Sequence, residues 1–190
     1  MFKMLGAGLL LAAGLGLTTA PAVALQASVT QIEKNSDGTV TYHFSFKTDK
    51  GETLAPGEGK SIGDFVTVYN FYGLVDGSVK SPDGWEFSSE EFGRTPIANG
   101  YPLVLPLDVP NTPNLTWTAK KAVAADTVVD GFTAITHVGS VVQGEYSAQV
   151  TRQAPAVQGA ASGTSNASAT MSKQAILGML PMPSFLADVK

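Results

Sequence analysis

The sequence predicts an all-β protein whose body is an antiparallel β-sandwich, immunoglobulin-like or jelly-roll-like, with about seven to nine strands. Between Leu25 and Gln153, apolar and polar residues alternate with a period of two, which is the pattern of half-buried strands. Turn signals recur along the same stretch, and no segment in it keeps the 3.6-residue period of an amphipathic helix. The turn signals are Asp49-Lys50-Gly51, Asp76-Gly77, Pro82-Asp83-Gly84, Asn99-Gly100 and Asp130-Gly131.

A first hairpin is predicted near the start of this body. Residues 39–47 read TVTYHFSFK, which places the apolar side chains on one face and the polar side chains on the other. The preceding ASVTQIE, residues 27–33, is expected to pair with this strand through the turn Asn35-Ser36-Asp37-Gly38, because Asp-Gly supplies the positive φ angles of a tight turn.

A second hairpin is predicted at the end of the body. Residues 132–142 form one strand, Gln143-Gly144 makes the turn, and EYSAQVT, residues 145–151, runs back. Further strands are expected at 104–109 and in LTWTA, residues 115–119, where Trp117 is expected to be the central tryptophan of the core.

The stretch GDFVTVYNFYG, residues 63–73, contains four aromatic residues and no charge after Asp64. As a strand it is largely apolar on both faces, with Phe65, Tyr69 and Phe71 on the same one. This pattern predicts a central strand that is covered on both sides, so these three aromatics are assigned to the core rather than to a binding platform.

The N-terminus, residues 1–24, has the pattern of a secretory signal peptide. Lys3 precedes an apolar run from about Met4 to Leu17, and a small-residue segment ends in Ala22-Val23-Ala24. The run is too short for a membrane-spanning helix, which needs roughly 20 apolar residues. We therefore expect cleavage after Ala24, no stable membrane insertion afterwards, and a secreted, extracellular or cell-surface location, with the periplasm as the alternative.

Charge and cysteine content narrow the classes of partner and chemistry. The chain carries 12 basic and 16 acidic residues, a net charge of −4, and cleavage after Ala24 removes only Lys3, which leaves 11 against 16 and a charge of −5. Nucleic acid and anionic lipid both require a basic surface, so neither is expected as a partner. The absence of Cys excludes disulfides, Cys-based zinc sites and Cys nucleophiles, and it favours a bacterial source.

The C-terminus is predicted to lie outside the sandwich, which is assigned to residues 25–153. Residues 154–172 are rich in Ala, Gly, Ser and Thr and are typical of a flexible linker. Residues 173–190 form a short apolar tail interrupted by Pro181 and Pro183, so neither a spanning helix nor a good amphipathic helix is expected. The tail is interpreted as disordered, or as a docking or sorting segment for an unknown partner.

No catalytic site or metal site is predicted, and no cofactor. His43 and His137 are expected to be exposed strand histidines, because no nucleophile elbow lies near either. A pair of carboxylates could hydrolyse a glycoside, and Asp-rich loops could hold calcium, but turn and solvated-loop roles account for most of these acids. The acids in question are Asp64, Asp76, Asp83, Glu86, Glu90 and Glu91.

Three aromatic residues beside turns are the candidates for stacking against a sugar. Trp85 follows the Pro-Asp-Gly turn, Tyr101 follows Asn99-Gly100, and Tyr72 ends the aromatic stretch. Aromatics beside turns are better placed for exposure than those in the middle of a strand. The alternative for Trp85 is that it caps one end of the sandwich.

The order of segments in the body resembles a known group of exported proteins. GDFVTVYNFYGLVDGSVKSPDGWEF, PNLTWTA and GFTAITHVGSVVQGEYSAQVTR together resemble the ectodomains of PEP-CTERM-type bacterial proteins over about residues 63–152. The resemblance implies export and a link to exopolysaccharide production. It does not include the sorting signal, because MLPMPSFLADVK has no Pro-Glu-Pro box, spanning helix or basic cluster, which implies free release or another attachment route.

These observations predict an exported, non-enzymatic protein of the cell surface or extracellular matrix with a structural or interaction role. Its expected partners are polysaccharide or other surface proteins, and self-association is open because edge strands can pair with another chain. The first alternative is a carbohydrate-binding module that uses Tyr72, Trp85 and Tyr101. A glycoside hydrolase that uses acids among Glu86, Glu90 and Glu91 is the second.

Overall fold

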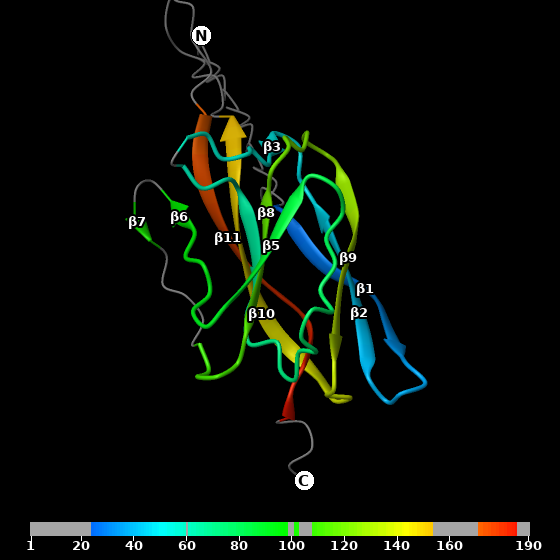
Figure 1. Cartoon of the computed structure of the whole chain (residues 1–190). Coiled ribbons are helices and arrows are strands. Elements are labelled where there is room, and N and C mark those ends of the chain that lie inside the picture. Colours follow the sequence, from blue (N-terminus) through cyan, green and yellow to red (C-terminus); the bar gives the residue numbers. More distant parts are fainter. Residues whose placement is uncertain (1–23, 60, 99–100, 103–107, 154–170, 186–190) are drawn as a thin grey trace, which may run out of the picture.

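The computed structural model describes residues 24–59, 61–98, 101–102, 108–153 and 171–185 (Figure 1). These residues are nearly all β, without an α-helix, and they confirm the predicted sandwich. The strands are β1 (Gln26–Lys34), β2 (Val40–Lys47), β3 (Glu52–Thr53), β4 (Phe65–Val68), β5 (Trp85–Glu90), β6 (Ile97–Ala98), β7 (Tyr101–Pro102), β8 (Asn114–Ala119), β9 (Val128–Thr136), β10 (Val141–Gln153) and β11 (Met171–Pro183). No helix in the described ranges is long and apolar enough to cross a membrane. Of the predicted signal peptide, residues 1–24, all but Ala24 lie outside these ranges.

Two antiparallel sheets face each other. The smaller sheet has the order β1-β2-β9, and the larger has the order β11-β10-β4-β8-β5, with β3 paired to one end of β10. The short pair β6-β7 lies beside the larger sheet, on the side away from the smaller one (Figure 1).

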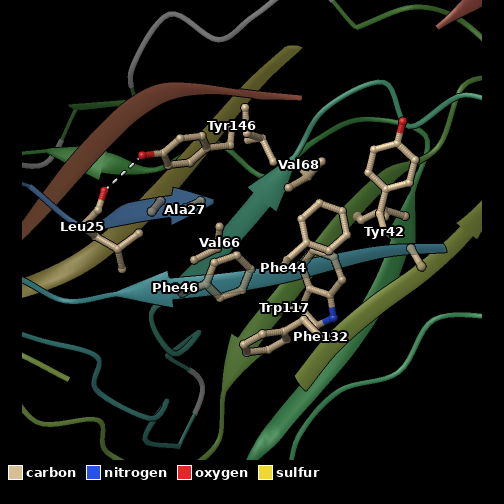
Figure 2. Packing of buried hydrophobic residues seen from close by; sticks show 14 of the residues in the cluster. Leu25, Ala27, Tyr42, Phe44, Phe46, Val66, Val68, Trp117, Phe132 and Tyr146 are labelled. Carbon is tan, nitrogen blue, oxygen red and sulfur yellow. Dashed lines mark hydrogen bonds between the residues drawn. The ribbon is translucent and has the colours of Figure 1, made fainter. Parts of the chain in front are cut away.

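The core between the sheets is built around Trp117, as predicted. Its ring centroid lies 5.4 Å from that of Phe44, 5.7 Å from Phe46 and 5.6 Å from Phe132. Figure 2 shows this cluster, in which β8 supplies the tryptophan and the smaller sheet supplies the three phenylalanines. Aromatic pairs at these separations add roughly 0.5–1.5 kcal/mol each to the gain from burial, so the cluster fixes how the sheets pack.

The aromatic stretch is a central strand with both faces buried, also as predicted. All four residues of β4 are buried, and β4 lies between β10 and β8. The predicted alternation fails only at its end, because Asn70 adopts a positive φ of 53°. This left-handed residue shifts the phase of the chain, so Phe71 enters the core against Tyr42 at 5.5 Å instead of lying on the face of Phe65 and Tyr69.

The outer face of the larger sheet is polar yet buried around β4. Thr67 and Thr116 share a hydrogen bond of 2.9 Å across the strands. Tyr69 donates to the carbonyl oxygen of Arg94 at 2.9 Å, and the backbone N–H of Ile97 donates to the side chain of Gln149 at 3.1 Å. The connection from β5 to β8 therefore covers this face and satisfies its polar groups.

One of the two predicted hairpins is confirmed and the other is wrong. β1 pairs with β2 from Gln26↔Lys47 to Lys34↔Val40 around Gly38, whose φ is 86°. At the other end of the body β9 and β10 belong to different sheets, and β10 runs straight through Gln143-Gly144. Gly144 is needed there for space rather than for a turn, since a Cβ would lie 2.5 Å from Cγ of Met182.

The C-terminal tail is part of the sandwich, which corrects its assignment to a disordered or separate segment. Residues 171–183 form β11, which pairs antiparallel with β10 from Val141↔Pro183 to Gln153↔Met171. Ile176, Leu180 and Met182 of this strand are buried in the core. The prolines in the tail do not prevent this, because β11 is an edge strand whose outer side needs no N–H donors. Residues 154–170 lie outside the described ranges.

Candidate functional site

Trp85, a predicted stacking residue, belongs to the rim of the core. It starts β5 and points between the sheets, with its ring 5.0 Å from that of Phe132 and 6.0 Å from that of Phe46. This matches the alternative role, in which Trp85 caps the end of the sandwich. The ring is partly buried against the core, which leaves less of it open to a sugar.

Tyr72 is the predicted stacking residue that borders a hollow. Its ring meets that of Phe185 edge to face at 5.5 Å, and both side chains keep some exposure. The hollow beside it has a volume of about 260 Å³ and is lined by Tyr72, Asn70, Gln143, Glu145 and Met179, among others. The side chain of Tyr101, the third candidate, lies outside the described residues. The other two candidates do not form a shared site, because Tyr72 contacts Phe185 while Trp85 contacts Phe132.

The exposed acids near β5 form ion pairs instead of a shared site. Asp83 accepts from Lys121 and Glu86 from Lys120, each at 2.5 Å. The hydrogen bond from Lys121 lowers the pKa of Asp83, and the hydrogen bond from Lys120 lowers the pKa of Glu86. Both carboxylates are therefore held in the charged form, which suits a solvated ion pair and not a general acid.

Glu90 is held by a cluster on the outer face of the larger sheet. Arg94 donates to it at 2.9 Å and also to the hydroxyl of Thr118 at 2.7 Å, while Ser88 donates to the same carboxylate at 2.8 Å. Glu90 and Glu91 line an open hollow of about 300 Å³ with Asn111. Asp76 lies in a turn at Asp76-Gly77, as predicted.

Asp64 is fully buried and joins the C-terminal strand to the rest of the sheet. Its carboxylate accepts from the backbone N–H of Ala55 at 2.8 Å, from Thr151 at 2.7 Å and from Lys173 of β11 at 2.5 Å. The sequence predicted Asp64 to be one of several turn or loop acids, and this structural role was not predicted. No sequence signal could have found the pairing, because 109 positions separate the two charges.

A second buried carboxylate, Glu52, lies at the same end of β10. Arg152 donates to it at 3.0 Å and also lies 3.7 Å from Asp49. Burial raises the pKa of Glu52, partly offset by the backbone N–H of Asp49 and the charge of Arg152. This arrangement anchors β3 to β10 and leaves the carboxylate no access to a substrate.

The two histidines lie apart from these groups. His43 is half-buried on β2, with its Nε2 at 3.7 Å from Glu33, and His137 is exposed after β9. Among the described residues no three or more His, Asp and Glu side chains are placed to hold a metal ion.

The outward side of β11 carries apolar residues that are exposed to solvent, and the sequence did not predict them. Leu177 is 51% exposed and Met179 is 56% exposed, and β6 beside it adds exposed Ile97. We call Leu177 and Met179 the β11 face. Along β11 these two exposed residues alternate with the buried side, which includes Ile176, Leu180 and Met182. The sequence does not reveal this alternation, because AILGMLPM is apolar at nearly every position.

Comparisons with known protein families, with curated proteins and with solved structures found no match.

Proposed function

We propose that this chain is an exported bacterial protein of the cell surface or extracellular matrix, with a structural and self-associating role and no catalytic one. The observation that carries the proposal is the position of β11. This apolar strand completes the core with one side and exposes Leu177 and Met179 with the other. Exposed apolar side chains on an edge strand are a common means of contact between copies of a chain.

The acids support the same reading. Asp64 and Glu52 are buried in structural ion pairs, and Asp83 and Glu86 are paired with lysines at the surface. A glycosidase needs one carboxylate held as a general acid beside another, with room for a sugar ring between them. The partners of these four acids give them structural roles instead.

The experiment is a fractionation of the native cells, following peptides of the mature chain by mass spectrometry. We expect enrichment in the washed matrix and outer surface over soluble periplasm and clarified medium. Replacing the β11 face with Leu177→Ser and Met179→Ser should release the chain into the soluble fractions. Ile32→Ser is the matched control, because Ile32 is an exposed apolar residue on the smaller sheet. A soluble periplasmic pool for the unaltered chain would contradict the proposal.

Carbohydrate binding is the second candidate, and the hollow beside Tyr72 is the observation that favours it. An aromatic ring next to the polar side chains of Asn70, Gln143 and Glu145 is a lining that suits a sugar. Tyr72→Ala should then abolish retention on exopolysaccharide with little change in thermal stability. Equal retention of the variant and the unaltered chain would remove this candidate.

A further inference from the structure

We propose that β11 exchanges between copies of this chain, so that β11 of one copy occupies the position beside β10 of a second copy. The inference depends on the proposed structural role and names its partner, a second copy. It also explains how one copy could be linked to the next without a new surface, because the exchanged strand makes the contacts that it already makes within one copy.

The place beside β10 is shaped for β11 in one register. Gly178 of β11 faces Tyr146, and a Cβ there would lie 2.4 Å from the tyrosine ring. Conversely, a glycine of β10, Gly144, leaves room for a side chain of β11, Met182. These two close fits of a side chain against a glycine, together with Lys173 bound to Asp64, make a shifted register costly.

Every group that receives β11 precedes residue 154. The backbone of β10 pairs along the whole strand, Asp64 and Thr151 bind Lys173, and the core of the two sheets surrounds Ile176 and Leu180. A β11 from another copy would meet the same partners in the same order. The local contacts therefore do not distinguish the two arrangements, and the connection between the strands decides.

This connection is far longer than the hairpin requires. Gln153 and Met171 are register partners, so the ends of the connection lie next to each other across the ladder. A β-hairpin closes with two to five residues, whereas here residues 154–170 intervene. Their Ala, Gly, Ser and Thr composition belongs to chains whose root-mean-square span at this length is roughly 23 Å, enough to reach an adjacent small domain.

The prolines of β11 favour exchange over addition of another strand to its free edge. Pro181 and Pro183 pair with Gln143 and Val141, and a proline fits this ladder only where its missing N–H would face away from β10. The free edge consequently lacks donors at its C-terminal end, which hinders an incoming strand. In an exchanged assembly β11 remains an edge strand, so its prolines break no hydrogen bond of the sheet.

Concentration sets the balance between the two arrangements. A connection of this length and composition is expected to give its own strand an effective concentration of about 1 mM, so closed monomers should dominate in dilute solution. Exchange becomes populated when the local concentration of copies approaches that value, as in a dense surface layer.

The test uses two single-thiol variants of the full chain, which has no Cys of its own. Glu145 and Met179 are register partners on the outer face and both are exposed, so one variant carries Glu145→Cys and the other Met179→Cys. Neither can form a disulfide within one copy. The two are mixed in urea, refolded together at about 0.5 mM, near the effective concentration of the connection, and oxidised. We expect mixed disulfide dimers at least about tenfold above an off-register pair, as effective-concentration gains predict.

The off-register control pairs Glu145→Cys with Met171→Cys, since Met171 is equally exposed on the same strand. The double variant Glu145→Cys/Met179→Cys should close a disulfide within one copy when refolded at low concentration, which verifies the register. Failure to close it, or mixed dimers no more abundant than the off-register pair, would overturn the exchange. An excess of dimers between two Met179→Cys chains would instead indicate contact between β11 faces. In either case the fractionation result for the native cells still decides the proposed function separately.

Discussion

Replacing Leu180 with Ala tests directly whether the C-terminal strand belongs to the folded core. Leu180 is 2% exposed and packs inside the sandwich from β11, 27 positions beyond the last residue of the body that the sequence predicted. Removing a buried leucine side chain costs about 2–5 kcal/mol, because apolar contact is lost and the cavity closes only in part. We expect about 3 kcal/mol here, since an edge strand can relax more than a central one.

Leu177→Ala is the matched control, because it makes the same chemical change three residues away at a position that is 51% exposed. It should cost at most about 0.5 kcal/mol. The assay is urea unfolding of the mature chain followed by tryptophan fluorescence, where Trp117 reports on the core. Thermal unfolding should show the Leu180→Ala midpoint lower by roughly 6–12 °C. Equal stability of the two variants would refute the placement of β11 in the core.

Four further changes probe other parts of the sandwich. Lys173→Met removes the cation from a buried carboxylate and should cost about 2 kcal/mol in urea unfolding, less than for a fully buried pair because Lys173 is 37% exposed. Trp85→Ala should lower the unfolding free energy by about 2–3 kcal/mol, which a stacking residue on the surface would not do. Tyr42→Phe should leave stability unchanged or raise it by up to about 1 kcal/mol, since the Tyr42 hydroxyl is buried without a hydrogen-bond partner among the described residues. Glu52→Gln should remove the contribution of Glu52 to the pH dependence, so that the variant loses less stability, or gains more, than the unaltered chain between pH 4 and pH 7 in urea unfolding.

The sign of the Glu52 effect follows from its raised pKa. Because burial raises the pKa of Glu52 in the folded state, the folded chain keeps a proton that the unfolded chain releases. Its contribution to stability is therefore full below the unfolded pKa and is lost as pH rises from there through the folded pKa. The glutamine variant does not titrate, so an unchanged pH slope would contradict this account.

The proposed functions differ in which substitution matters, which makes them separable. Loss of matrix retention on changing Leu177 and Met179 points to contact between copies, and loss on changing Tyr72 points to sugar. Trp85 is uninformative for either, because its removal disturbs the core. A substitution at Trp85 should therefore be judged by its stability before any binding result is read from it.

Local patterns were sufficient wherever one element decides its own structure. The period of two in residues 40–47 predicted β2, and Asp37-Gly38 predicted the β1–β2 hairpin, because both depend on neighbours in sequence. The burial of β4 on both faces was predictable because its stretch is largely apolar, and the central position of Trp117 was predictable because it alternates with Leu115.

Longer-range features were not predictable in the same way. The turn at Gln143-Gly144 was a reasonable expectation, but the glycine serves Met182 from β11, a contact between residues 38 positions apart. The predicted alternation of side chains between the two faces failed after Asn70, because the sequence does not indicate that this residue adopts a left-handed conformation. Of the three predicted stacking residues, Trp85 belongs to the core and Tyr72 borders a hollow, and their own positions beside turns could not separate these roles.

The sequence by itself determined that the body is an all-β sandwich, because alternation and turn chemistry act over a few residues. Only the tertiary structure decided where the chain after residue 170 goes. An apolar segment with two prolines has no preferred local structure, and it becomes a strand because β10 and the open side of the core receive it. The ion pair between Asp64 and Lys173 was settled in the same way, since two charges far apart in the chain become partners only when the fold brings them together.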